Sequence, residues 1–194
     1  MKSMRKVSVL VIFLGAVIQG CALKPQNVHL DPEVEYAKEV SPSEVLIGFS
    51  VADDRPTKKL GEIGDAHQAK VDVTLNEDFV PLLTERLTAG IEQRGFMVDP
   101  DDPTVGRTLT IKVDNLALNS VKMPMTFRTE LRADVTAVAA TESGVYERVY
   151  YVQTSQDTAG PPYEGQTNKL INEAMSQALT AVMNDDKLFE ALTR

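Results

Sequence analysis

The sequence offers one thiol, and its position is the clearest chemical signal in the chain. Cys21 is the only cysteine in 194 residues, so an internal disulfide bond is excluded. It comes soon after an apolar run from Val7 to Ile18, which itself follows a basic start from Lys2 to Lys6. This run is too short to cross a bilayer and has the length of the apolar part of a secretory signal peptide. The Cys21 sulfur is therefore free for covalent modification.

The residues Ile18-Gln19-Gly20-Cys21 resemble the lipobox of bacterial lipoproteins. The resemblance implies that residues 1–20 are a signal peptide, cleaved between Gly20 and Cys21, and that a diacylglycerol is attached to the Cys21 sulfur. Several acyl chains, at about 0.8 kcal/mol per buried CH₂, would hold the protein on membrane lipid without a spanning segment. The alternative is an unmodified thiol left by an ordinary signal peptide.

Ala22, the residue after the cysteine, resembles the sorting pattern that lets lipoproteins move on to the outer membrane. An Asp at this position would instead favour retention in the inner membrane. We therefore expect the chain to be lipid-anchored to the outer membrane and to face the periplasm.

The sequence contains few of the residues and none of the motifs that the common kinds of catalytic site require. The only histidines are His29 and His67, and no GxSxG, HExxH or P-loop motif occurs. Carboxylates that could take part in chemistry occur at Asp53-Asp54, at Asp65 near His67, and at Asp99, Asp101 and Asp102. The last group lacks the alternating ligands and the Gly turn of a calcium loop, so a solvated turn is the simpler interpretation. We expect no enzyme activity, no metal and no cofactor.

The charge of the chain argues against nucleic acid as a partner. The formal net charge is −8, and the first 20 residues contain bases but no acids, so the rest of the chain is more acidic still. An acidic surface without a basic stripe repels the phosphate backbone. We expect an envelope protein as the partner instead.

Three groups of residues are candidates for partner contact. Asp54-Arg55-Pro56 follows an apolar run, and a charged pair there predicts either a structural clasp with a bidentate contact or a partner-binding loop. Tyr146 and Tyr150 lie on one tyrosine-rich strand, where at least one tyrosine should be exposed. Met123-Pro124-Met125 predicts either gap-filling core or an adaptable contact surface.

The remaining patterns predict the elements that position these residues. Residues 21–42, with three prolines and little periodicity, predict a lipidated flexible tether. Residues 43–194 predict one domain. Its strands are expected at 45–51, at 70–75 and at 109–118, the last with a bulge near 114–115, and 125–137 and 145–154 are expected to pair as a hairpin. Its helices are expected at 78–95 and 168–183, and a short terminal turn should extend the second to 192. A loop is expected at 60–64.

This order of elements predicts an α+β fold. We expect an antiparallel or mixed sheet of about four to six strands with two helices packed on one face. Pro81 falls in the first turn of the first expected helix, and Gly95 stands where a glycine commonly ends one.

Several segments together resemble the YajG family of small Gram-negative lipoproteins. They are the lipobox with Cys21, the strand and loop at 48–56 with Leu60-Gly61, Leu82-Leu83 leading into 94–98, and the end of the chain from Asn168 to Leu192. The resemblance implies an envelope location and this fold, and it supplies no catalytic motif.

The function expected from these features is a non-enzymatic accessory or interaction module for an envelope protein complex. It would dock through a sheet edge, the Asp54-Arg55 loop or exposed tyrosines. One alternative is a carrier that binds a lipid or a cell-wall fragment between helices and sheet, which would need an apolar pocket there. Another is a hydrolase with two converging carboxylates.

Overall fold

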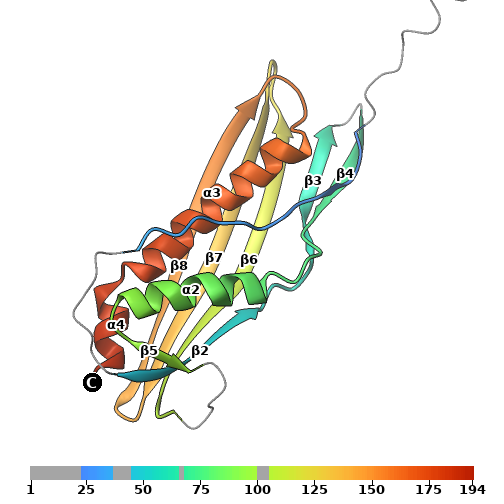
Figure 1. Ribbon diagram of the computed structural model, residues 1–194. Helices are drawn as coiled ribbons and strands as arrows, with labels where there is room; N and C mark the ends of the chain where they lie inside the picture. The colour runs from blue at the N-terminus through green and yellow to red at the C-terminus, as the bar shows by residue number, and fades with distance from the viewer. Residues whose placement is uncertain (1–22, 37–44, 66–67, 100–104) are drawn as a thin grey trace, which may run out of the picture.

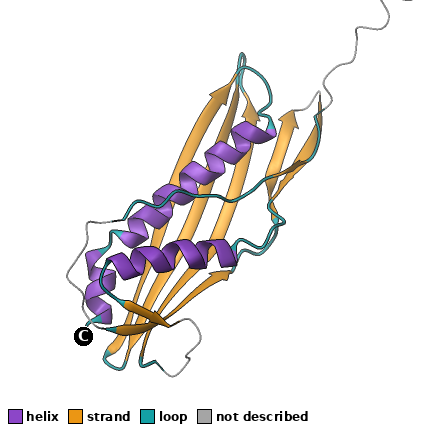
Figure 2. Cartoon of the chain, viewed as in Figure 1, coloured by secondary structure: helices purple, strands orange, loops and turns teal. Residues whose placement is uncertain are grey.

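The computed structural model describes residues 23–36, 45–65, 68–99 and 105–194 (Figures 1 and 2). The expected signal peptide, the cleavage site at Gly20 and the lipidation site Cys21 lie outside the described residues. The described chain forms a mixed sheet with helices gathered on one face, so the predicted α+β class is confirmed.

Strand β6 (Arg107–Lys122) organises the sheet. One of its edges pairs antiparallel with β7 (Phe127–Thr141) over the full length of both strands, and β7 pairs in turn with β8 (Gly144–Thr158). The other edge is divided, because β2 (Leu46–Asp53) pairs parallel with its first half and β3 (Lys59–Asp65) pairs parallel near its end. The sheet is therefore forked on that side. A register shift between Val113 and Asn115 confirms the predicted bulge.

Each branch of the fork carries further strands. On one branch β5 (Met97–Asp99) pairs with β2, and on the other β4 (Gln68–Thr74) pairs with β3 and β1 (Gln26–Asn27) pairs with β4. The sheet thus has eight strands, and the expected four to six was too few. The loop predicted at 60–64 is instead part of β3.

Glycine is what lets β3 reach β6. A Cβ at Gly61 would lie 2.0 Å from the carbonyl oxygen of Leu118, so a larger residue would push the two backbones apart. Glycine in a strand often marks such a close approach of backbones. Gly61, which helped to make this segment look like a loop in the sequence, is therefore the residue that allows β3 to pair with β6.

Helices α2 (Val80–Gln93) and α3 (Glu164–Met183) lie on the same face of the sheet (Figure 1). Pro81 is in the first turn of α2, and Gly95 follows the helix with a φ of 89°, as the sequence predicted. A third helix, α4 (Asp186–Leu192), replaces the expected short terminal turn, because Asp185 caps it and Leu188, Phe189 and Leu192 are buried.

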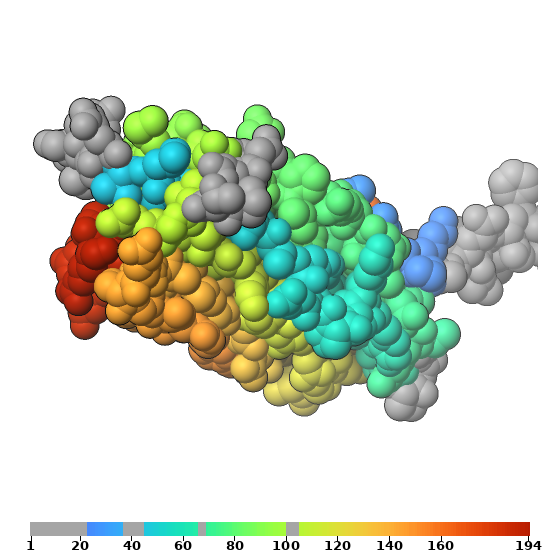
Figure 3. Space-filling view, turned by 90° about the horizontal axis from the view of Figure 1, so that it is seen from below, coloured from blue at the N-terminus to red at the C-terminus, as the bar shows by residue number. Residues whose placement is uncertain are grey.

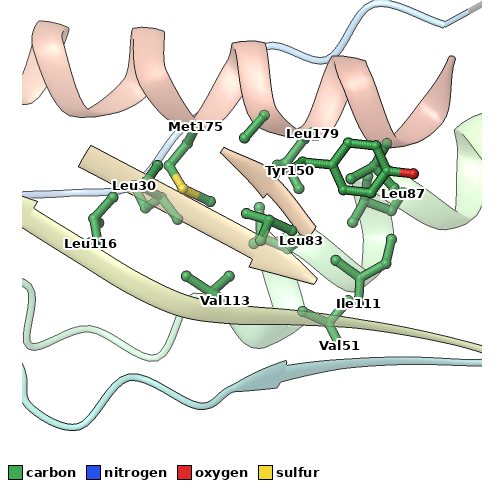
Figure 4. Close-up of a cluster of buried hydrophobic side chains, with 14 of the residues drawn as sticks. Leu30, Val51, Leu83, Leu87, Ile111, Val113, Leu116, Tyr150, Met175 and Leu179 are labelled. Carbon is green, nitrogen blue, oxygen red and sulfur yellow. The ribbon is translucent and has the colours of Figure 1, made fainter. Parts of the chain in front are cut away.

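The space between the helices and the sheet is filled by apolar side chains (Figure 4). Two leucines of α2, Leu83 and Leu87, are fully buried, and so are Met175 and Leu179 of α3. They face fully buried side chains of β6 such as Ile111 and Val113. Burial of this kind is the main favourable contribution to folding, at roughly 25 cal/mol per Å² of apolar surface.

Residues 23–36, here called the N-terminal strap, lie across the helices rather than away from them (Figure 1). Gln26, Val28, Leu30 and Pro32 are buried while the residues between them are exposed. Leu30 lies inside the hydrophobic cluster of Figure 4. The strap therefore contributes its own face to the core.

A row of polar side chains on α3 satisfies the backbone of the strap. Asn168 accepts a hydrogen bond from the backbone N–H of His29 at 2.8 Å, and Asn172 donates to the His29 carbonyl at 3.0 Å. One turn or more further along, Thr180 accepts from the N–H of Glu35 at 3.1 Å, and Asn184 donates to its carbonyl at 3.3 Å. These residues are spaced by four or eight positions, which places them on one side of the helix and its C-terminal cap. The polar face of α3 thus binds the strap.

The prediction of a flexible tether over 21–42 is consequently wrong for residues 23–36. Two side chains beyond α3 reinforce the strap: Glu77 accepts from the N–H of Leu30, and Arg86 donates to the Pro32 carbonyl and pairs with Asp31. The prolines made the segment look irregular, but an extended chain held by side chains needs no regular strand partner. Residues 21–22 and 37–42 lie outside the described residues.

A Leu30→Ala variant tests whether the strap is part of the folded unit. Removing this buried side chain should lower the free energy of unfolding by about 2 to 3 kcal/mol, measured by urea unfolding of the lipidated protein in detergent. Lys24→Ala, at an exposed strap position, is the matched control and should change it by less than about 0.5 kcal/mol. Equal stability of the two variants would contradict a docked strap.

Candidate interaction surface

Arg55 is a structural clasp. Its side chain is only 2% exposed, and it donates two hydrogen bonds to Asp53, from Nε to Oδ1 at 2.7 Å and from Nη2 to Oδ2 at 2.8 Å. The guanidinium also lies over the Phe79 ring, 4.8 Å from its centre. These hydrogen bonds lower the pKa of Asp53. The clasp joins the end of β2 to the start of α2.

The expected pairing within Asp54-Arg55 is therefore replaced by pairing with Asp53. Asp54 points elsewhere, with its carboxylate 3.6 Å from Lys112 Nζ and its side chain about half exposed. The bidentate contact that the sequence suggested is present, but Arg55 is too deeply buried to serve in a partner-binding loop. Of the charged pair Asp54-Arg55, only Asp54 is accessible on this turn.

Tyr150 belongs to a second structural cluster, centred on Asp185. The Tyr150 hydroxyl donates to Asp185 Oδ2 at 2.6 Å, and Arg148 donates to the same oxygen at 2.8 Å. The other oxygen, Oδ1, accepts from the backbone N–H of Lys187 at 3.0 Å and so caps α4. One carboxylate thus connects strand β8 to the last helix.

Burial and bonding in this cluster shift two pKa values. Burial alone would raise the pKa of Asp185, but hydrogen bonds from Tyr150 and Arg148 outweigh it, and the pKa is lowered. Burial, followed by the hydrogen bond to Asp185, raises the pKa of Tyr150. Both groups are held in the states that favour the cluster at neutral pH.

The two tyrosines proposed for partner contact are therefore not a free surface. Tyr150 is 6% exposed, which contradicts its expected role as an exposed tyrosine, and Tyr146 is partly buried with its hydroxyl 3.4 Å from Asp185. The exposed tyrosine of this strand is Tyr151. Alternation along a strand separates neighbours onto opposite faces, so Tyr150 and Tyr151 could not both have been exposed.

The face of the sheet that the helices leave open carries the exposed apolar residues of β8. Val145, Val149 and Tyr151 are all more than half exposed and point to this side. In register beside them on β7 stand Ala140, Thr136 and Asp134, so the surface continues across two strands. We call this the β8 outer face. Its residues were missed because the sequence does not say which side of the strand the helices cover.

Next to Tyr151 the β8 outer face is slightly hollowed. A depression of about 320 Å³ is lined by residues of three adjacent strands, including Asn119, Arg132 and Gln153. Arg132 stacks over the Tyr151 ring at 4.9 Å and forms an ion pair with Asp134 at 2.9 Å. The depression combines an aromatic ring with charged and amide groups, a composition found at contact surfaces between proteins.

Strand β8 is also an edge. Among the described strands it pairs only with β7, and it is 15 residues long. An edge strand presents backbone N–H and C=O groups that can pair with another chain. The β8 outer face and this edge are adjacent parts of one accessible strand.

Many carboxylates of the described residues form ion pairs. Hydrogen bonds from Lys59 and Arg128 lower the pKa values of Glu62 and Asp157 respectively. In the described ranges no group of three His, Cys, Asp or Glu side chains is placed to hold a metal. Likewise, none of the helices described there combines the length and apolar character needed to cross a bilayer.

An Asp185→Asn variant tests the cluster while keeping a residue that caps helices well. At pH 7 it should lose about 1 to 3 kcal/mol of unfolding free energy, because a charged hydrogen-bond acceptor is removed from the buried Tyr150 hydroxyl and the half-exposed Arg148 guanidinium. Because the native pKa is lowered, the ionised carboxylate stabilises the fold above about pH 4, and this contribution is lost as the pH falls through the native pKa.

The stability difference between wild type and Asp185→Asn should therefore shrink below about pH 4 in thermal unfolding followed at several pH values. Tyr150→Phe keeps the buried ring and removes one donor, so it should cause a smaller loss with less pH dependence. A difference that stays constant into acid would contradict the assignment.

The curated relatives of this chain are described as lipoproteins. Two curated relatives, each described as uncharacterized lipoprotein YajG, come from Escherichia coli strain K12 and from Escherichia coli O6:H1. Each is 26% identical over 176 residues, covering 87% of this chain and 85% of the relative. A solved structure described as a homolog of a neuraminyllactose-binding hemagglutinin from Helicobacter pylori matches with a TM-score of 0.51 and 11% identity, covering 86% of this chain and 98% of that one. At that identity the likeness concerns the fold alone.

A family model described as uncharacterized lipoprotein matches residues 32–193, which include part of the strap, both long helices and most of the sheet. The resemblance that the sequence suggested is thereby confirmed. The chain belongs to the YajG family of uncharacterized lipoproteins.

Proposed function

We propose that this chain is a non-enzymatic accessory module, lipid-anchored through Cys21 to the outer membrane and facing the periplasm, that docks on an envelope protein through β8. The observation that carries this proposal is the coincidence, on one strand, of a long open edge and exposed apolar side chains. The partner would add a strand to the edge and cover the β8 outer face with apolar or β-branched side chains.

The chemistry of β8 suits this kind of docking. Backbone pairing at a strand edge supplies affinity, and pockets for alternate side chains supply specificity. Tyr151 is an aromatic side chain beside a depression and in contact with Arg132, and tyrosine and arginine are the residue types that most often dominate interface energies. Exposed apolar groups gathered on one strand mark interaction sites more often than isolated ones do.

The carrier function is not favoured by any contact in the described residues. A carrier would bind its ligand between helices and sheet, where the core is instead filled by side chains such as Leu83, Ile111 and Met175. The hollows described on this chain lie at the surface, for example beside Tyr151 and between the strap and α3. Interaction through the surface therefore fits the geometry better than enclosure of a ligand.

The anchor is tested by Cys21→Ser. Without the sulfur no diacylglycerol can be attached, so the mutant should accumulate as an unlipidated precursor, detected by mass spectrometry and by its absence from the outer-membrane fraction. Wild-type chain of unmodified mass, or normal processing and fractionation of the mutant, would contradict the anchor.

The docking surface is tested by in-cell crosslinking and affinity capture of the lipidated protein carrying Val149→Asp with Tyr151→Ala. Removing an interface anchor typically costs at least about 2 kcal/mol, so capture of an envelope partner should fall by roughly thirtyfold. The matched control is Met97→Asp, which places the same charge at an exposed apolar position on β5. This strand lies at the edge of the sheet opposite to β8.

Both variants change exposed residues, so their thermal unfolding should stay close to that of wild type. Partner capture that is lost equally in the Met97→Asp control would contradict a site on β8. Copurification of extracted lipid or muropeptide in place of a protein would favour the carrier function.

A further inference from the structure

The strap brings the anchored end of the chain to one end of the molecule. Strand β1 runs parallel to β4, with Gln26 opposite Val73, so Leu23 lies at the level of Lys70 near the start of β4. Gln26 also donates a hydrogen bond to the Pro162 carbonyl at 2.8 Å, which ties β1 to the loop before α3. In Figure 1 the strap starts at the upper end of the molecule, while Figure 3 shows it opposite the red atoms of α4.

A docked strap leaves little length between the domain and a lipid on Cys21. Leu23 is packed against the hydrophobic core, and it follows Cys21 by two residues. Two residues span at most about 7 Å even when fully extended. A lipid on Cys21 therefore brings this end of the domain to the membrane surface, which a flexible tether of twenty residues would not do.

The same end carries the most exposed apolar side chain of the described residues. Met125, at the turn between β6 and β7, is 88% exposed, and its neighbours Met123 and Val121 are also exposed. The turn is closed by a hydrogen bond from the Met123 N–H to the Thr126 carbonyl at 2.7 Å, so these side chains project from a defined hairpin tip. Three strand spacings, about 14 Å, separate β1 from β6.

Charged groups near the hairpin tip form pairs that offset the acidity of the chain locally. Lys122 binds Asp65 at 2.6 Å, which also links the tip to the end of β3, and Arg128 binds Asp157 at 2.9 Å. The carboxylates of Asp65 and Asp157 are thus each paired with a basic side chain. Tyr163 lies further from the tip, at the start of α3, and is 66% exposed. Tyrosine is common at the headgroup level of membranes, and flexible apolar side chains suit the layer beneath it.

We propose that the β6–β7 hairpin tip, with Val121, Met123 and Met125, inserts into the surface of the bilayer that holds the lipid on Cys21. This inference rests on the proposed anchor. The partner is the lipid surface itself, with Tyr163 at its polar boundary. The orientation directs α4 and the turn between β7 and β8 away from the membrane and leaves β8 accessible along its length.

Because the chain contains no tryptophan, single tryptophan probes report the depth of chosen positions. The lipidated Met125→Trp protein is reconstituted into phospholipid vesicles, with and without brominated acyl chains. The matched probe is Val145→Trp, at a position 68% exposed just after the turn between β7 and β8, about 45 Å away along β7. We expect blue-shifted emission and loss of more than half its intensity in brominated vesicles for Met125→Trp alone.

Emission from Met125→Trp that stays unshifted and is quenched only by aqueous acrylamide, in protein shown by mass to carry the lipid, would overturn the inference and leave the anchor intact. Equal quenching of both probes by brominated lipid would also overturn it, because the domain would then have no preferred end. A chain without lipid would refute the anchor first. Thermal unfolding of both lipidated variants in detergent checks that each probe leaves the fold unchanged.

Discussion

Strand β6 has two edges and three long neighbours, and the rest of the fold follows from how it accommodates them. Its pairing with β7 uses one edge completely, so β2 and β3 must share the other, and the sheet forks. The inward side chains of β6, such as Leu109 and Ile111, are fully buried beneath the helices. Because the helices cover one face only, the opposite face and the outer edge of β8 remain open.

Local patterns made part of this fold predictable. The alternation along 125–137 and 145–154, the turn residues between them and the helical spacing around Leu83 and Leu87 each report a short-range preference, and the structure agrees with them. The bulge in β6 and the start and end of α2 were also predictable, since proline and glycine constrain the backbone directly.

The strap and β3 depend on tertiary contacts and could not be found in the same way. Val28, Leu30, Val34 and Tyr36 alternate, but the intervening Pro32 and the absence of a regular strand partner hide the pattern. Its backbone is satisfied by Asn168, Asn172 and Arg86, which are distant in sequence. Similarly, Gly61 is a turn residue by composition and a packing residue only once Leu118 lies beside it.

Of the candidate site residues, the tyrosines lie on one strand as the sequence predicted, but the sequence did not show which of them the helices cover. It placed tyrosines on β8, but the choice between Tyr150 and Tyr151 depends on Asp185, a residue that lies 35 positions away and becomes a neighbour only through α3 and α4. Arg55 was correctly associated with a bidentate contact, yet its burial against Phe79 required the position of α2. Charged residues that looked like surface features therefore hold elements together.

The way the strap meets the sheet also determines how the domain would carry a mechanical load. Strand β1 lies parallel to β4, and the hydrogen bond from the Val28 N–H to the Thr74 carbonyl, 2.8 Å long, continues the same pairing. Tension from a lipid at Cys21 would act along β1, so its hydrogen bonds would be sheared together rather than peeled apart singly. A peripheral strand of two residues, supported by the side chains of α3, is thus placed to resist detachment of the strap when the domain is pulled away from an anchored Cys21.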